Sequence, residues 1–201
     1  MRAVFSTLLV ALAIGAAGSA RAGSIQDLPP SCRAFAWVPA DVRDDTLAWN
    51  QLLSLASCLQ DASIEHVSQP DELAPMVARL TRALAIPMEI YLGAIERGPG
   101  PVQLRAAYQL AMAHVALIVR ARCSLADPAL SAELEPMLER SARIAWLTFA
   151  VIDRAAAQDP TLARDPVAQN MVRNARAMLR LLSPPSEQDR ERYNVARDLA
   201  R

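Results

Sequence analysis

The chain has 201 residues, with 21 arginines, no lysine and 21 acidic residues, so its formal net charge is zero. The missing lysine excludes phosphate-binding loops of the Gly-Lys-Ser/Thr type, Schiff-base chemistry and Ser-x-x-Lys acyl transfer, because each needs a lysine amine. Alanine contributes 39 residues and leucine 26. This excess of strong helix formers over β-branched residues predicts an all-α protein.

The first 22 residues have the features of a secretory signal peptide. Arg2 supplies the positive charge, residues 5–17 form the apolar stretch, and Ala20-Arg21-Ala22 is a small-x-small cleavage site. We therefore expect export as a soluble protein, to the periplasm or the extracellular space. The chain after cleavage carries about two net negative charges, which predicts no general attraction to nucleic acid or to an anionic membrane.

Residues 23–40 contain three prolines and little periodicity, so we expect an extended leader that lies on the fold. A single all-helical domain is expected over residues 41–201, and Asp41 is a suitable cap for its first helix. The apolar residues of this helix recur at three- and four-residue spacing, which predicts a core stripe. The stripe consists of Trp49, Leu52, Leu53, Ala56 and Leu59.

Proline and glycine residues indicate where the next two helices are interrupted or end. One helix is expected from about residue 71 to residue 97, with an interruption at Pro87, which lacks a backbone donor. Residues 98–101 read Gly-Pro-Gly-Pro and predict a turn before a helix over about 102–124. The apolar run 106–119 within that helix is shorter than the roughly 20 residues that span a bilayer. It is therefore interpreted as a buried helix, and no transmembrane segment is expected after signal cleavage.

Three Asp-Pro pairs follow, each combining a helix cap with a first-turn proline. They bracket a fourth helix ending near Gln158 and a fifth ending near Leu182, and Ser186 is a suitable cap for a short C-terminal helix. The predicted fold is thus all-α. It consists of antiparallel helical hairpins, stacked as a short repeat-like array or a compact bundle, with five main helices plus the short C-terminal one.

An internal similarity raises the possibility of duplication. Residues 72–82 match residues 133–143 at six of eleven positions. Duplicated hairpins would cover residues 41–97 and 102–154, with residues 155–201 as the remainder. A composition as biased as this one also yields such matches by chance, so both explanations stay open.

Cysteine pairing is expected in an exported protein, and three cysteines leave one thiol over. The preferred pair is Cys32 with Cys58, which would link the leader covalently to the first helix. Cys58 with Cys123 is the alternative if the two repeat units stack.

Two polar groups within apolar surroundings, Glu89 and His114, could touch if their helices fold back around residues 98–101. Such a pair could serve as general base and orienter, although a buried acid also needs a partner for purely structural reasons. Arg173, Arg176 and Arg180 share one face of the fifth helix, and this arginine face can bind carboxylates or phosphates, or be a solvated face. The opposite face is predicted to be the packing stripe of the helix and consists of Val167, Met171, Ala175, Met178, Leu179 and Leu182.

The sequence contains no Cys-x-x-Cys or His-Glu-x-x-His spacing, so no metal site and no cofactor is predicted. The preferred functional hypothesis is an exported, non-catalytic binding or scaffold protein that recognises a peptide or protein in a groove between helices. The first alternative is a bundle that holds a small apolar ligand or lipid among its methionines. The second is an enzyme that uses dispersed carboxylates with His114.

Overall fold

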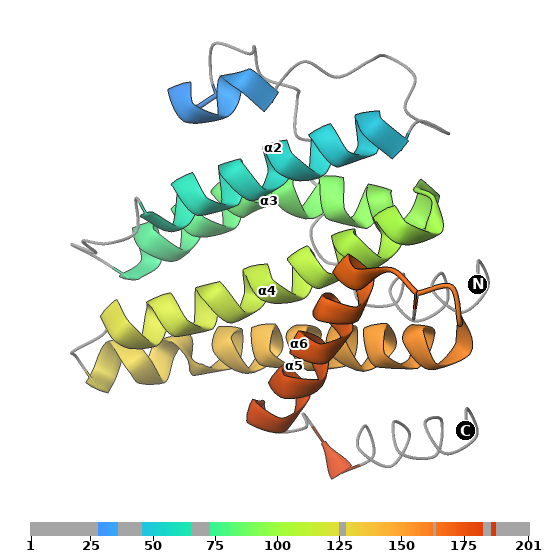
Figure 1. Cartoon of the computed structure of the whole chain (residues 1–201). Helices are drawn as coiled ribbons and strands as arrows, with labels where there is room; N and C mark the ends of the chain where they lie inside the picture. The colour runs from blue at the N-terminus through green and yellow to red at the C-terminus, as the bar shows by residue number, and fades with distance from the viewer. Residues whose placement is uncertain are drawn as a thin grey trace. The chain divides into compact units, whose positions relative to one another are not determined.

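The computed structural model describes residues 28–35, 46–65, 73–124, 128–162, 164–182 and 186–187. Within these ranges every regular element is a helix, so the predicted all-α class with five main helices is confirmed (Figure 1). The elements in chain order are η2 (Pro30–Phe35), α2 (Thr46–Glu65), α3 (Leu73–Arg97), α4 (Gly100–Ser124), α5 (Pro128–Gln158) and α6 (Pro166–Leu181).

Several predictions concern other parts of the chain. The signal peptide over residues 1–22, the helix cap at Asp41 and the body of the short helix after Ser186 lie outside the described residues. The described chain divides into two compact units, residues 1–106 and residues 107–201, with the boundary inside α4. The duplicated hairpins therefore stay a prediction, as does the single domain over residues 41–201.

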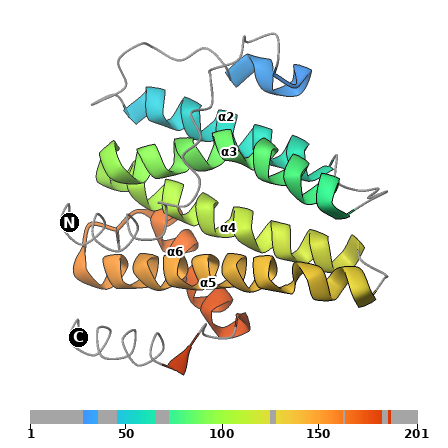
Figure 2. The same ribbon diagram turned by 180° about the vertical axis from the view of Figure 1, so that it is seen from behind.

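In the first unit, α2 and α3 run antiparallel side by side, as Figures 1 and 2 show from opposite directions. The buried Tyr91 of α3 donates its hydroxyl hydrogen to Gln60 Oε1 of α2 at 3.0 Å. Arg105, in the first turns of α4, donates to Asn50 Oδ1 of α2 at 2.8 Å. These two bonds join α2 to both following helices, while the predicted apolar stripe, with Trp49 and Leu53 buried, supplies the core.

The predicted interruption at Pro87 is wrong, because α3 continues through this residue to Arg97. Pro87 removes one backbone donor from the helix. Its ring is fully buried, however, so the apolar surface removed from water offsets part of the lost hydrogen bond. The helix ends instead at the predicted Gly-Pro turn, where Gly98 N donates to Ala94 O at 2.9 Å.

Gly98 is required at this turn by the close approach of its neighbours. A Cβ atom at position 98 would lie 2.6 Å from the backbone oxygen of Ala94 and 2.8 Å from Val102 Cγ1. Both distances are below the separation that non-bonded carbon and oxygen atoms tolerate, so any side chain would force the backbone to move. At Gly100, by contrast, a Cβ would meet nothing within 4 Å.

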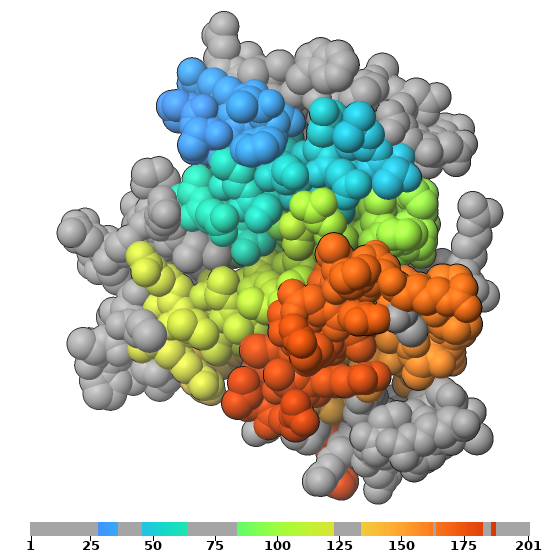
Figure 3. Space-filling model, viewed as in Figure 1, coloured from blue at the N-terminus to red at the C-terminus, as the bar shows by residue number. Residues whose placement is uncertain are grey.

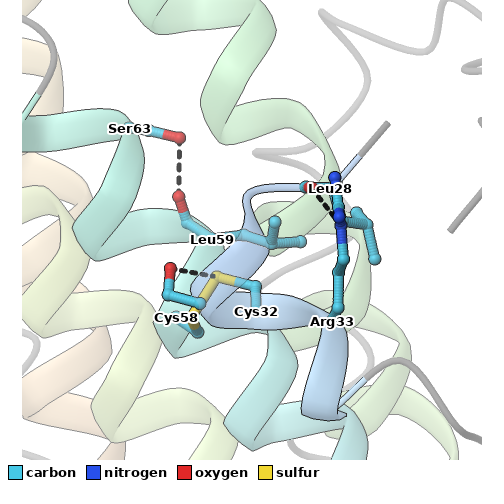
Figure 4. Close-up of a disulfide and its surroundings, with 7 residues drawn as sticks. Leu28, Cys32, Arg33, Cys58, Leu59 and Ser63 are labelled. Atoms are coloured by element: carbon cyan, nitrogen blue, oxygen red, sulfur yellow. Dashed lines mark hydrogen bonds between the residues drawn. A yellow bond between two sulfur atoms is a disulfide. The ribbon is translucent and has the colours of Figure 1, made fainter. Parts of the chain in front are cut away.

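The predicted disulfide between Cys32 and Cys58 is confirmed, with a Cα–Cα distance of 5.6 Å (Figure 4). It joins η2 to α2, and the alternative pairing of Cys58 with Cys123 is therefore not formed. The bond is surrounded by apolar side chains, since the fully buried Cys32 packs with Leu55 and Leu59 of α2. The leader differs from the expected extended chain, because Pro30–Phe35 forms a 3-10 helix.

In the second unit, two contacts fix α4 antiparallel to α5. The rings of Tyr108 and Phe149 meet edge to face with their centroids 6.2 Å apart. Arg122 Nη2 lies 3.6 Å from Glu135 Oε1, nearer the other ends of the two helices. The residue numbers rise along α4 as they fall along α5, as an antiparallel pair requires. The described core of α5 includes Leu138, Trp146, Phe149 and Ile152.

α6 crosses α5 and lies at the surface in the view of Figure 3. Its buried residues are Ala168, Val172 and Ala175. The packing stripe predicted for this helix is therefore partly wrong, because Val167 is 63% exposed. The cause is local: Val167 follows the capping residue and the first-turn proline directly, and the face that meets α5 begins one residue later.

By length and composition, Gly100–Arg122 of α4 meets the criteria for a helix that could cross a membrane, and it does so alone among the described residues. Its most apolar window is 56% buried inside the protein. A buried core helix meets the same criteria, as the sequence interpretation of this segment expected.

Candidate functional site

The N-terminus of α6 is set by the predicted Asp-Pro pair. Asp165 has extended backbone angles and accepts a hydrogen bond from Val167 N at 2.8 Å, with Pro166 at the first helical position. This is the arrangement in which a capping carboxylate satisfies one of the free donors of a helix start. The cap fixes where α6 begins and therefore which of its side chains face α5.

The segment before α6 is shaped by a second aspartate. Asp159 Oδ1 accepts from both the backbone nitrogen and the hydroxyl of Thr161, at 2.9 and 2.6 Å. These bonds favour the ionised carboxylate and hold the pKa of Asp159 below its ordinary value. Leu162 N donates to Asp159 O at 3.1 Å, so the same turn positions the buried Leu162.

An ion pair joins α5 to α6. Arg176 Nε donates to Asp153 Oδ1 at 2.5 Å, and the Asp153 side chain is 7% exposed while that of Arg176 is 55% exposed. A buried carboxylate needs such a partner, because removing an unpaired charge from water is costly. The pair therefore holds the Arg176 guanidinium against α5 and leaves its outer side at the surface.

Beside this pair is a cavity of about 280 Å³, which we call the α5–α6 hollow. Four of its lining residues, Gln169, Val172, Arg173 and Arg176, come from α6 at positions i, i+3, i+4 and i+7, which is one face of a helix. Ala156 of α5 and Leu162 of the preceding turn complete it. The hollow thus combines aliphatic side chains with two guanidinium groups and one amide.

The structure places two of the three predicted arginines, Arg173 and Arg176, at the α5–α6 hollow. Arg173 is exposed and donates from Nη2 to Asn170 Oδ1 at 2.8 Å, a neutral partner. Among the residues that the structure describes, it has no carboxylate partner. Arg180 is exposed one turn beyond Arg176 and does not line the hollow.

α6 itself carries no acidic residue, because the sequence Pro166–Leu181 contains three arginines and neither Asp nor Glu. Asp153 matches one of these charges from α5. The side of α6 that borders the hollow is therefore electropositive, which favours an anionic ligand at close range.

The structure does not show a contact between the other two predicted residues, Glu89 and His114. Glu89 is an exposed residue of α3 in the first unit. His114 belongs to α4 in the second unit. Since the two residues belong to different units, their contact stays a prediction.

His114 is largely removed from solvent, and its Nδ1 atom is buried without a hydrogen-bond partner among the described residues. Burial disfavours the charged imidazolium and lowers the pKa of His114 from 6.5 to about 4. The imidazole is therefore neutral at physiological pH, which agrees with the structural interpretation of a histidine on an apolar helix.

No group of three or more His, Cys, Asp or Glu side chains that could hold a metal ion occurs in the described part of the chain. The disulfide takes two of the three cysteines and joins η2 to α2. Trp49 of the predicted core stripe is buried, and so are Trp146 and Phe149 of α5.

Four of the six residues that line the α5–α6 hollow were not singled out from the sequence. Arg173 and Arg176 were found because helical spacing alone puts them on one face. Ala156 and Leu162 were missed because they meet α6 only through the turn after α5. Gln169 and Val172 were missed because helical spacing alone does not show which side chains of α6 border a hollow. The available signal was Asp153, a single carboxylate after the apolar run 144–152, which implies a cationic partner from another element.

Comparison with protein-family models, with curated proteins and with solved structures finds no match for the chain.

Proposed function

We propose that the chain is an exported, non-catalytic binding protein that recognises a peptide or a protein segment at the α5–α6 hollow. The observation that carries this proposal is the composition of the hollow, in which Leu162, Val172 and Ala156 offer aliphatic surface beside Arg173 and Arg176. An apolar pocket with a few convergent polar groups is the usual form of a binding site.

Export is supported by the signal-like first 22 residues and by the disulfide, since disulfides persist in oxidising compartments. The bond between Cys32 and Cys58 adds a covalent tie in a chain of modest size. It belongs to the first unit, whereas the hollow belongs to the second.

A ligand held among methionines is less well supported. The residues that line the hollow include no methionine, although Met171 and Met178 are on the same helix. An enzyme that uses His114 has less support still, because its neutral imidazole is not accompanied by a described acid or nucleophile within hydrogen-bond reach.

The test is selection of peptides with free C-termini from a displayed library on the immobilised full chain, followed by binding to two variants. Gln169→Trp fills the hollow from an exposed position of α6, so the fold should tolerate it. Arg180→Trp is the matched control, with the same new side chain on the same helix outside the hollow. Selected peptides should lose at least about tenfold in affinity for Gln169→Trp only.

If the selected peptides bind Gln169→Trp as tightly as wild type, the site is elsewhere and the proposal is wrong. Circular dichroism of each variant confirms that it is folded. Failure to select any peptide that saturates the wild-type protein would also contradict the proposal.

A further inference from the structure

We infer that the α5–α6 hollow recognises the free C-terminal end of a peptide or protein whose last side chain is small and aliphatic. The side chain enters the hollow between Leu162 and Val172, and the terminal carboxylate pairs with Arg173. This inference rests on the proposed function and names the part of the partner that is recognised.

The size of the hollow limits the occupant. Its volume of about 280 Å³ is slightly below the roughly 300 to 1,000 Å³ of pockets that enclose drug-sized ligands. A space of this size suits one or two residues of a chain end. It is too small to enclose a lipid with two acyl chains, whose tails would have to leave the hollow.

The charge of the rim determines the chemistry of the contact. Among the described residues Arg173 has one hydrogen-bond partner, the neutral Asn170 Oδ1, so most of its five N–H donors remain for a ligand. A guanidinium group binds a carboxylate through two parallel hydrogen bonds, which are stronger than bonds between neutral groups. Every chain end supplies such a carboxylate next to a side chain, whereas an internal segment places backbone amides there.

Asp153 gives the two arginines different roles. Because its buried carboxylate takes the Nε–H of Arg176, that guanidinium is held in one place and its charge is already matched. Arg176 is therefore held in place against α5, and Arg173 supplies a positive charge that no carboxylate of the described residues matches.

The inference is tested with an equimolar pool of acetylated tetrapeptides, Ala-Ala-Ala-X, in which X is Ala, Val or Leu. One pool has the free acid at the C-terminus and the other has the amide, so the two differ in the terminal group alone. Binding is followed by NMR titration of the isotopically labelled full chain through the backbone amides of Leu162 and Val172.

The acid pool should bind at least about tenfold more tightly than the amide pool, since a charge-assisted hydrogen bond is lost on amidation. Arg173→Ala should remove this preference. Arg180→Ala, which deletes the same charge from the same helix outside the hollow, should keep it. Gln169→Trp should abolish binding of both pools.

The outcomes separate the inference from the proposed function. If Gln169→Trp blocks binding but acid and amide bind equally, the hollow is a peptide site and the C-terminal inference is wrong. If Gln169→Trp has no effect on the selected peptides, the proposed function fails as well. Decanoate that binds more tightly than the acid pool would overturn the choice of a peptide end over a fatty acid, and the absence of a saturable shift would overturn the inference.

Discussion

Arg176 on α6 donates its Nε–H to the buried carboxylate of Asp153 on α5, and this bond ties the outer helix of the second unit to its longest one. The acid is removed from solvent, whereas the base is half exposed. Removing one partner is therefore expected to have a different cost from removing the other. Losing the arginine leaves a buried charge with a partner missing, and losing the acid leaves a cation that water can solvate.

Arg176→Ala should lower the free energy of unfolding by about 1 to 3 kcal/mol, the cost of a buried group that loses a charged hydrogen bond. Arg180→Ala, an exposed position on the same helix, should change it by less than about 0.5 kcal/mol. Urea denaturation of both variants checks this difference. The double variant Asp153→Asn/Arg176→Ala should recover part of the loss, and equal losses in Arg176→Ala and Arg180→Ala would contradict this account of the ion pair.

Reduction of the bond between Cys32 and Cys58 should destabilise the first unit. The bridged residues are 26 apart in the sequence, which corresponds to about 3.5 kcal/mol on the chain-entropy model. The variant Cys32→Ala/Cys58→Ala should therefore unfold at a clearly lower urea concentration than the oxidised wild type. Cys123→Ala in the oxidised protein is the matched control and should leave the midpoint close to that of wild type.

The turn between α3 and α4 gives a pair of glycine substitutions with opposite expectations. Gly98→Ala should cost about 1 to 3 kcal/mol, because its Cβ would overlap the Ala94 carbonyl oxygen and the Val102 side chain. Gly100→Ala meets open space at the start of α4 and should be neutral or slightly stabilising. Thermal unfolding of the two variants measures the contrast, and equal midpoints would show that the close approach at Gly98 does not hold.

The burial of His114 predicts a pH dependence of stability. Its pKa is about 4 in the folded chain and 6.5 when exposed, so the unfolded chain takes up the proton first as the pH falls. The stability linked to the neutral imidazole is complete above pH 6.5 and is lost progressively between pH 6.5 and about pH 4. At about 1.4 kcal/mol per pKa unit, the loss approaches about 3 kcal/mol.

The variant His114→Gln provides the comparison, because it removes the titrating ring and keeps a polar side chain. Urea denaturation at pH 7.5 and pH 5.0 should show a smaller loss of stability for His114→Gln than for wild type. An identical loss in both proteins would mean that other groups cause the pH dependence.

Helix positions could be predicted closely from the sequence, because proline, glycine and Asp-Pro pairs mark the ends locally. The pairing of Cys32 with Cys58 was predicted from the compartment and from the need to hold the leader. The effect of Pro87 on the helix was predicted wrongly. The sequence shows that proline lacks a backbone N–H donor, but it does not show that the ring is buried, because that burial depends on the tertiary structure. Val167 was misjudged because helical periodicity gives the width of an apolar face but not which edge meets α5.

The candidate site could be predicted only in part, for a physical reason. Arg173, Arg176 and Arg180 share one face of α6 because they are at positions i, i+3 and i+7. Only the packing of α6 on α5 determines that the first two line the hollow and the third does not. That contact depends on Asp153 and on the turn at Asp159, whose effects on α6 are not local in sequence. Asp153, an acid that follows an apolar segment, is the sequence feature that indicates this contact.

The central claim is that the α5–α6 hollow is a binding site for a peptide end, and the acid-to-amide affinity ratio measured on wild type and on Arg173→Ala tests it most directly. A ratio of at least about ten in wild type, falling to near one in Arg173→Ala and unchanged in Arg180→Ala, is the predicted result. A ratio near one in wild type, or one that Arg173→Ala leaves unchanged, would contradict it.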